Sequence, residues 1–204
     1  MNNDNLNSVG ALILAAGFSD RMGTPKPFLP YDNNVIFIEK IIQSYIEFGC
    51  SKVVITYDEN IEQWKGMIES FDNNDSVVFA LNLHPEYERF YSVKIGLSIM
   101  NDIDFCFLQN ADNPFITRTV LSTVYSRRKI DAFVVPTYNG QGGHPILLGN
   151  DVIDNILEVD GYNKNLKDIL LLKRRINCDV NDASVLVNIN SPDDYKKYFG
   201  KNYD

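Results

Sequence analysis

The sequence predicts an α/β fold whose central sheet is mainly parallel. Short apolar runs alternate with segments of helical periodicity along the chain, which is the pattern of βαβ units. The first run, Val9 to Ala15, contains no polar residue, as expected of a strand buried on both faces of a parallel sheet. The length of 204 residues and the hydrophobic share of 45% suit one α/β domain, so we expect a single domain over residues 1–204.

The predicted strands are short runs rich in apolar and β-branched residues. "KVVITY" and "VVFALN" follow the first run, and "DFCFLQN" leads into Ala111, Asp112 and Asn113. "DAFVVPTY" precedes a glycine-rich turn, and "HPILLG" is expected to form a short strand after it. In chain order, the predicted strands cover residues 9–15, 52–57, 77–82, 104–110, 131–138 and 144–149.

The predicted helices lie between these strands and after them. Ile38, Ile41 and Tyr45 recur at a spacing that places them on one face of a helix. Thr117 is a candidate N-cap, and Pro192 suits the first turn of the last helix. In chain order, the predicted helices cover residues 35–48, 61–71, 92–100, 117–127, 151–158, 165–174 and the segment from 191 onward.

Composition limits the classes of partner. The net charge of −8 argues against a nucleic-acid partner, which requires a basic face. No run of 18 apolar residues is present, so we expect no membrane span. Cys50, Cys106 and Cys178 are far apart in the sequence, and their odd number favours reduced thiols and a cytoplasmic location.

The loop after the first strand has the composition of an anion-binding loop. Gly17 and Gly23 permit close approach of the backbone to a ligand, and Arg21 and Lys26 supply cations for phosphate oxygens. The spacing matches neither the P-loop pattern nor the dinucleotide fingerprint. A surface turn with two solvated cations is the alternative interpretation, and composition alone does not decide between them.

A second polar turn follows the strand predicted at 104–110. Asp112 stands there before Pro114, where its carboxylate could coordinate Mg²⁺, an ion that prefers oxygen ligands and bridges phosphates. The alternative is an ordinary turn, since Asp and Asn favour such positions. Because ligands of open α/β sheets bind beyond the carboxyl ends of the strands, we expect this turn and the first loop to share a site.

Five segments of the chain resemble one enzyme family. "LAAGFSDRMGTPK" closely resembles L-A-A-G-x-S-x-R-M-G-x-x-K, the signature of the MobA-like nucleotidyltransferases, and within that family it is most similar to the molybdenum cofactor cytidylyltransferases. "FYSVKIGL", "FLQNADNPFIT", "GQGGHPILL" and "VLVNINSPDDY" resemble later family segments in the same order. The resemblance implies a single-domain, Rossmann-like three-layer sandwich of the nucleotide-diphospho-sugar transferase type.

The resemblance also implies roles for individual residues. The implied catalytic residues are Arg21, Lys26 and Asp112, and the implied metal ligands are Asp112 and Asn190. Many family members have Asp at the position of Asn190, so the second ligand here carries no charge. The implied nucleotide-binding residues are Leu14, Ala15, Ala16, Gly17, Ser19, Gly23, Asn82 and Ser92, and the implied acceptor-binding residues are Gly143 and His144.

For two of these residues the sequence leaves a structural alternative open. Ser92 could equally be the N-cap of the helix predicted at 92–100. His144 could be a hydrogen-bonded packing residue, as most isolated histidines are. We do not expect His144 to act as a general base, because a phosphate acceptor is already nucleophilic.

The implied reaction is Mg²⁺-dependent transfer of a nucleotide to a phosphate-bearing acceptor, with release of pyrophosphate. By resemblance, CTP is the first-choice donor, molybdopterin is the first-choice acceptor, and a molybdoenzyme is a further partner. One alternative is nucleotidyl transfer to a sugar phosphate or another alcohol phosphate. A second alternative is a nucleotide-binding accessory protein with little catalysis, which the neutral Asn190 and the bulky Glu88 and Tyr91 would suit.

Overall fold

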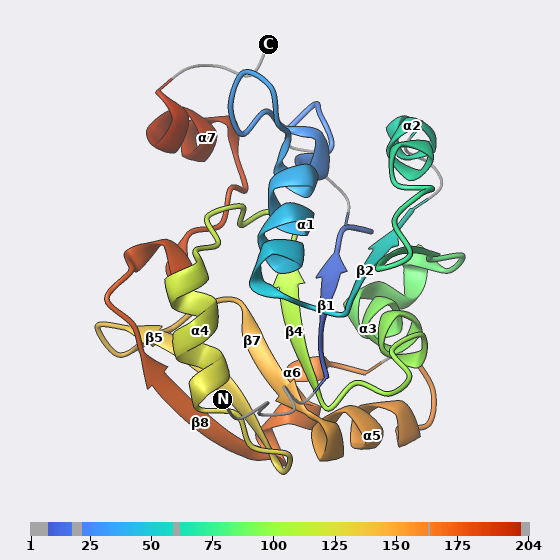
Figure 1. Cartoon of the computed structure of the whole chain (residues 1–204), viewed down its shortest axis with the longest axis vertical. Helices are drawn as coiled ribbons and strands as arrows, with labels where there is room; N and C mark the ends of the chain where they lie inside the picture. Colours follow the sequence, from blue (N-terminus) through green and yellow to red (C-terminus); the bar gives the residue numbers. More distant parts are fainter. Residues whose placement is uncertain (1–7, 18–21, 59–61, 163, 201–204) are drawn as a thin grey trace, which may run out of the picture.

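The computed structural model describes residues 8–17, 22–58, 62–162 and 164–200. Within these residues the chain forms an eight-stranded sheet in the order β3-β2-β1-β4-β7-β5-β6, with β8 paired to β5 (Figure 1). The strands are β1 (Val9–Leu14), β2 (Lys52–Tyr57), β3 (Val77–Leu81), β4 (Phe105–Asn110), β5 (Ala132–Tyr138), β6 (Gln141–Gly142), β7 (Ile146–Gly149) and β8 (Arg174–Asp179).

The sheet is mainly parallel, as predicted. β1 lies between β2 and β4 and is parallel to both. β3 continues the parallel arrangement beyond β2, and β8 is parallel to β5. The exceptions are β7, which runs antiparallel between β4 and β5, and the two-residue β6. The chain reverses direction there because the glycine-rich turn joins β5 to β6 and β7 over a few residues.

Helices cover both faces of the sheet, which confirms the three-layer arrangement. Alternate residues of β1 point to opposite faces: Ala11 and Ile13 join one apolar cluster, and Leu12 joins the other. The first cluster includes α1 (Phe37–Phe48), α2 (Gln63–Ser70) and α4 (Arg118–Ser126), and the second includes α3 (Glu88–Ser98), α5 (Asn150–Glu158) and α6 (Leu166–Leu171). None of the described helices combines the length and apolar character needed to cross a membrane.

A third, smaller cluster joins the C-terminal helix to the loop after β1. Tyr195 of α7 (Pro192–Phe199) is fully buried beside Met22, Leu29 and Phe37. Its hydroxyl donates a hydrogen bond to the carbonyl of Pro30 at 2.7 Å. The last helix therefore fixes the position of the loop that carries Lys26.

Two element boundaries differ from the prediction by three residues or more. α3 begins at Glu88 rather than at Ser92, because its buried stripe starts at Phe90 and continues through Val93 and Leu97. Ser92 therefore lies inside the helix and is not its N-cap.

The helix predicted at 165–174 is too long, since α6 ends at Leu171 and strand β8 follows. β8 was not predicted because only Cys178 among its residues is buried. A polar strand that pairs with a single neighbour has no apolar run to identify it.

Candidate active site

The candidate site lies at the carboxyl edge of the sheet, beyond the ends of β1 and β4. The chain leaves β1 toward β2, whereas β4 pairs with the opposite side of β1. The two loops therefore diverge at a topological switch point, where ligands of open α/β sheets bind. The amide of Ala111 donates to the carbonyl of Leu14 at 3.1 Å and ties the two strand ends together.

A buried polar network shapes the turn that carries Asp112. Gln109 has no exposed surface; its amide nitrogen donates to the carbonyls of Asn110 at 2.8 Å and Asn113 at 2.9 Å, and its side-chain oxygen accepts from the Tyr45 hydroxyl at 3.1 Å. Because buried polar groups are costly unless paired, these bonds hold the turn in one conformation. Asp112 is thereby fixed at the edge of the sheet.

Lys26, Asp112 and Asn190 meet at this edge. The Lys26 Nζ donates to the Asn190 Oδ1 at 2.6 Å and lies 3.6 Å from the Asp112 Oδ2. Both charged side chains are mostly buried, with 18% of Lys26 and 21% of Asp112 exposed. The three residues come from segments far apart in the sequence, and the sequence analysis placed all three at one site.

Two features bring Asn190 into place. The amide of Ile189 donates to the carbonyl of Asp112 at 2.8 Å, which holds the final segment against the turn after β4. Ser191 then caps α7: its hydroxyl accepts from the amide of Asp194, whose carboxylate accepts from the amide of Asn190 at 3.1 Å. Asn190 is therefore held immediately before a helix that is anchored by Tyr195.

The carboxylate of Asp112 has an electrostatic environment suited to a cation. Burial raises the pKa of Asp112, and the charges of Lys26 and Arg89 act in the opposite direction. Its second oxygen, Oδ1, is buried and has no hydrogen-bond partner among the described residues. An oxygen of this kind is a fitting ligand for a divalent cation, so the residues present fit the implied metal.

The metal would have few protein ligands. Among the described residues there is no cluster of three or more His, Cys, Asp or Glu side chains that could hold an ion. Asp112 and Asn190 would instead hold a divalent cation together with substrate phosphates, which is typical of Mg²⁺ sites.

The predicted nucleotide-binding residues occupy the same edge, so far as they are described. Ala15 is buried and donates its amide to the carbonyl of Thr56 at 2.9 Å, while Gly17 is exposed. Gly23 has a φ of 70°, a left-handed conformation that glycine adopts without strain. Leu14 and Ala16 are partly buried on either side of Ala15. Ser19 and Arg21 lie outside the described residues, so their predicted roles stay predictions.

Asn82 and Ser92 form a buried pair rather than an open binding surface. The side-chain amide of Asn82 donates to the Ser92 hydroxyl at 3.0 Å, and its oxygen accepts from the amide of His84 at 2.8 Å. Their exposed fractions are 2% and 5%. The pair joins the end of β3 to α3, and its predicted contact with nucleotide stays a prediction.

Gly143 occupies a position where no side chain fits. A Cβ at this residue would lie 2.3 Å from the carbonyl oxygen of Val185, which is backbone and cannot rotate away. The amides of Gly143 and His144 donate to the carbonyls of Pro136 and Val185, each at 2.8 Å. Glycine therefore allows the loop to pack closely enough to position His144.

A Gly143→Ala variant is expected to lose about 1–3 kcal/mol of unfolding free energy, because the added methyl group overpacks this contact. Gly66→Ala is the matched control: nothing lies within 4 Å of its added Cβ in α2, and we expect a gain of about 0.4–1 kcal/mol. Thermal melts of both variants test this. Equal stability of Gly143→Ala and wild type would contradict the packing argument.

His144 lies between the catalytic edge and a cavity. Its Nε2 is 3.3 Å from the side-chain amide nitrogen of Asn110, the last residue of β4. Burial, followed by the charge of Arg89, lowers the pKa of His144 to about 4. The imidazole is therefore neutral at pH 7.

His144 is expected to make folding pH-dependent. Below about pH 6.5 the unfolded chain protonates this histidine, but the folded chain does so only near its lowered pKa of about 4. Stability should therefore fall as the pH drops through this window, by up to about 3 kcal/mol. Urea denaturation at pH 7 and pH 4.5 tests this against His144→Gln, which should show a smaller decrease. An identical decrease in both proteins would contradict the assignment.

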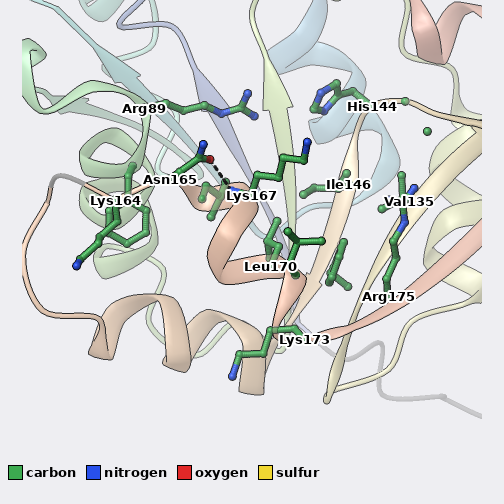
Figure 2. A pocket seen from close by; sticks show the side chains of 16 residues that line it. Arg89, Val135, His144, Ile146, Lys164, Asn165, Lys167, Leu170, Lys173 and Arg175 are labelled. Atoms are coloured by element: carbon green, nitrogen blue, oxygen red, sulfur yellow. Dashed lines mark hydrogen bonds between the residues drawn. The ribbon is translucent and has the colours of Figure 1, made fainter.

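A cavity of about 710 Å³ adjoins His144 and reaches the face covered by α3 and α6 (Figure 2). Gly143 and His144, the two predicted acceptor-binding residues, are part of its wall. Sequence reasoning missed all five cations of its described lining, Arg89 and Lys167 among them. Arg89 immediately precedes the segment "FYSVKIGL", so its position in the sequence was a usable signal, whereas Lys167 had none because only the packing of α6 brings it to this cavity.

Comparisons with known proteins agree with this arrangement. A family model described as the MobA-like NTP transferase domain matches residues 11–176. The molybdenum cofactor cytidylyltransferase of Escherichia coli (strain K12) is 26% identical over 194 residues, which cover 93% of this chain and 95% of that protein.

Two solved structures share the fold. A nucleotidyl transferase from Methanothermobacter thermautotrophicus has a TM-score of 0.76 at 20% identity, covering 94% of this chain and 96% of that chain. Rv0371c from Mycobacterium tuberculosis, in complex with manganese, has a TM-score of 0.68 at 17% identity, covering 95% and 99%. Because the family model spans most of the sequence, the chain belongs to the MobA-like NTP transferase domain family and is a nucleotidyltransferase.

Proposed function

We propose that this nucleotidyltransferase transfers CMP from CTP to a phosphate-bearing acceptor, with molybdopterin as the first candidate, and releases pyrophosphate. The observation that carries the proposal is the convergence of Lys26, Asp112 and Asn190 at the switch point of a MobA-like fold. The choice of CTP and molybdopterin is supported by the similarity to the E. coli molybdenum cofactor cytidylyltransferase.

In the proposed reaction, an oxygen of the acceptor phosphate attacks the α-phosphorus of the nucleotide in line. A new P–O bond forms as the bond to pyrophosphate breaks, and no covalent enzyme intermediate is needed. Lys26 would neutralise charge on the phosphates, and the backbone at Ala16 and Gly17 would hold the triphosphate together with Arg21. Orientation of the two phosphates supplies the rest of the rate enhancement.

We propose Mg²⁺ as the resident ion, held by Asp112 and Asn190. When bound, the ion would offset the charge that develops on the phosphate oxygens. The unpartnered Oδ1 of Asp112 and the oxygen of Asn190 are the protein atoms available to hold it. Lys26 would then exchange its hydrogen bond with Asn190 for contacts with phosphate. The manganese complex of the M. tuberculosis relative supports a divalent cation in this fold.

We further propose that residues 1–204 act as one nucleotidyltransferase domain in the cytoplasm, with a molybdoenzyme as partner. The described cysteines, Cys50, Cys106 and Cys178, are buried free thiols, which suits a reducing compartment.

A catalytically weak accessory protein is the second candidate. It is favoured by one observation: Asn190 is uncharged, and its oxygen already accepts a hydrogen bond from Lys26 at 2.6 Å. Calorimetry with CTP and Mg²⁺, followed by a turnover assay, separates the two candidates. Binding of CTP without turnover on any acceptor would favour the accessory role.

The direct test is release of pyrophosphate by the purified chain. We expect release with CTP, Mg²⁺ and molybdopterin, slower release with the other three common nucleoside triphosphates, and none after chelation of the metal. Preference for GTP or UTP would contradict the cytidylyl assignment. Faster turnover on a sugar phosphate than on molybdopterin would contradict the acceptor.

A further inference from the structure

The cavity beside His144 is strongly positive in an acidic protein. Its described lining contains five cationic side chains and no acidic one, although the chain as a whole carries a net charge of −8. The cations are Arg89, Lys164, Lys167, Lys173 and Arg175. Such a local excess of one charge raises the concentration of ligands of the opposite charge.

Two of these cations, Arg89 and Lys167, extend toward His144 and have no hydrogen bond or ion pair of their side chains among the described residues (Figure 2). The side chains of Arg89 and Lys167 extend from α3 and α6 toward His144, whereas the ends of Lys164 and Lys173 point away (Figure 2). Lys173 donates to the side chain of Asn155, and Arg175 donates its Nε to Asn177 at 2.8 Å. Within the described part of the chain, the ion pairs include neither Arg89 nor Lys167.

Each of the two residues sits on a fixed element. Arg89 is in the first turn of α3 and is followed by Phe90, which is 1% exposed and anchors that turn in the core. Lys167 is in the first turn of α6, where its amide donates to the side chain of Asn165 at 2.9 Å. The fold thus holds the two cations in the wall of one cavity, where an anion could contact both.

We propose that Arg89 and Lys167 form a clamp for the phosphate of the acceptor. The inference rests on the proposed function and names the residues that would present the attacking group. Arg89 supplies the planar fork that binds phosphate through two oxygens, and Lys167 supplies a point charge. The clamp faces His144, because the Arg89 and Lys167 side chains both extend toward it (Figure 2). A phosphate held there lies toward the edge where the nucleotide would bind.

The floor of the same cavity selects the body of the acceptor. It is built from apolar side chains, namely Phe90, Phe133, Val135, Ile146, Leu166 and Leu170. Asn165 is the one side-chain amide among the described lining residues, and its oxygen already accepts from the Lys167 amide. The hydroxyl groups of a sugar phosphate would lose their hydrogen bonds to water and find no hydrogen-bond partners among these apolar side chains. The acceptor is therefore a phosphate monoester with an apolar or aromatic body.

Phenyl phosphate and glucose 1-phosphate are suitable probes, since both are monoesters and differ in body. We expect calorimetric titration to show that the wild type binds phenyl phosphate more tightly than glucose 1-phosphate. Arg89→Gln and Lys167→Gln should each weaken it about tenfold or more, the loss expected for a charged hydrogen bond. Lys129→Gln is the matched control, because Lys129 is exposed between α4 and β5 and outside the cavity lining, and this variant should bind phenyl phosphate within about twofold of wild type.

The outcomes distinguish this inference from the proposed function. Under steady-state assay the clamp variants should raise KM for the acceptor and leave KM for CTP within about twofold. Unchanged phenyl phosphate binding in both variants, or loss of binding in Lys26→Met instead, would overturn the clamp. If the wild type bound glucose 1-phosphate as tightly as phenyl phosphate, the inference that the acceptor has an apolar or aromatic body would be overturned. Failure of wild type to bind CTP, with phenyl phosphate binding intact, would instead count against the proposed function.

Discussion

A Lys26→Ala variant is expected to lose about 10³-fold in kcat/KM, the loss typical of removing one preorganised donor to a charged transition state. The Lys26 Nζ is the described cation closest to both Asp112 and Asn190, at 3.6 and 2.6 Å. Lys26 is the one cationic side chain in the described part of this loop, so its removal takes that charge away from Asp112 and Asn190. Steady-state kinetics with varied CTP would measure the loss, and circular dichroism would confirm that the fold is kept.

Lys26→Arg and Lys129→Ala are the controls for this result. Arginine keeps the positive charge but spreads it over a planar guanidinium group. Because the charge is kept, Lys26→Arg should retain more activity than Lys26→Ala. Lys129→Ala removes the same charge from an exposed position and should leave kcat/KM near that of wild type. Near-normal turnover in Lys26→Ala would remove this lysine from the mechanism.

An Asp112→Asn variant is expected to lose at least about 10³-fold in kcat, because the substitution removes the charge of the carboxylate proposed to hold the metal. The metal concentration that this variant needs for half-maximal activity should also be higher than for wild type. The exposed Asp72 offers a matched control, since Asp72→Asn makes the same chemical change away from the site. Activity of Asp112→Asn equal to that of Asp72→Asn would contradict the assignment.

The same variant should be no less stable than wild type. The pKa of Asp112 is raised by burial, so the folded chain binds a proton more tightly than the unfolded chain. Stability contributed by this group is present at low pH and is lost as the pH rises through the folded pKa. Asparagine does not ionise, so the variant avoids the stability that wild type loses when the Asp112 carboxyl group ionises. Thermal melts at pH 7 should therefore give a Tm equal to or above that of wild type. A lower Tm would indicate that the carboxylate stabilises the fold.

Buried elements could be predicted from the sequence because their signal is apolar and local. β1 and β4 are apolar runs buried on both faces, and their parallel pairing follows from the alternation of strands and helices. Once these strands were assigned, the edge shared by Lys26 and Asp112 followed from topology. Asn190 joined them through resemblance, since nothing local in its sequence indicates a metal ligand.

The acceptor side was less predictable because it depends on tertiary contacts. Arg89 and Lys167 are single cations on different helices, and only packing brings them to the same cavity. β8 is a polar strand whose one buried residue is Cys178, so periodicity did not reveal it. Asn82 and Ser92 were assigned to the pocket by resemblance, but their bond to each other is visible only in the folded chain.

The most direct test is a crystal structure with Mn²⁺ and a non-hydrolysable CTP analogue, in which anomalous scattering locates the metal. We predict a manganese peak within about 2.3 Å of an Asp112 carboxylate oxygen, with the Lys26 Nζ in contact with the analogue's phosphates. Triphosphate bound away from the ends of β1 and β4, or manganese away from Asp112, would contradict the account.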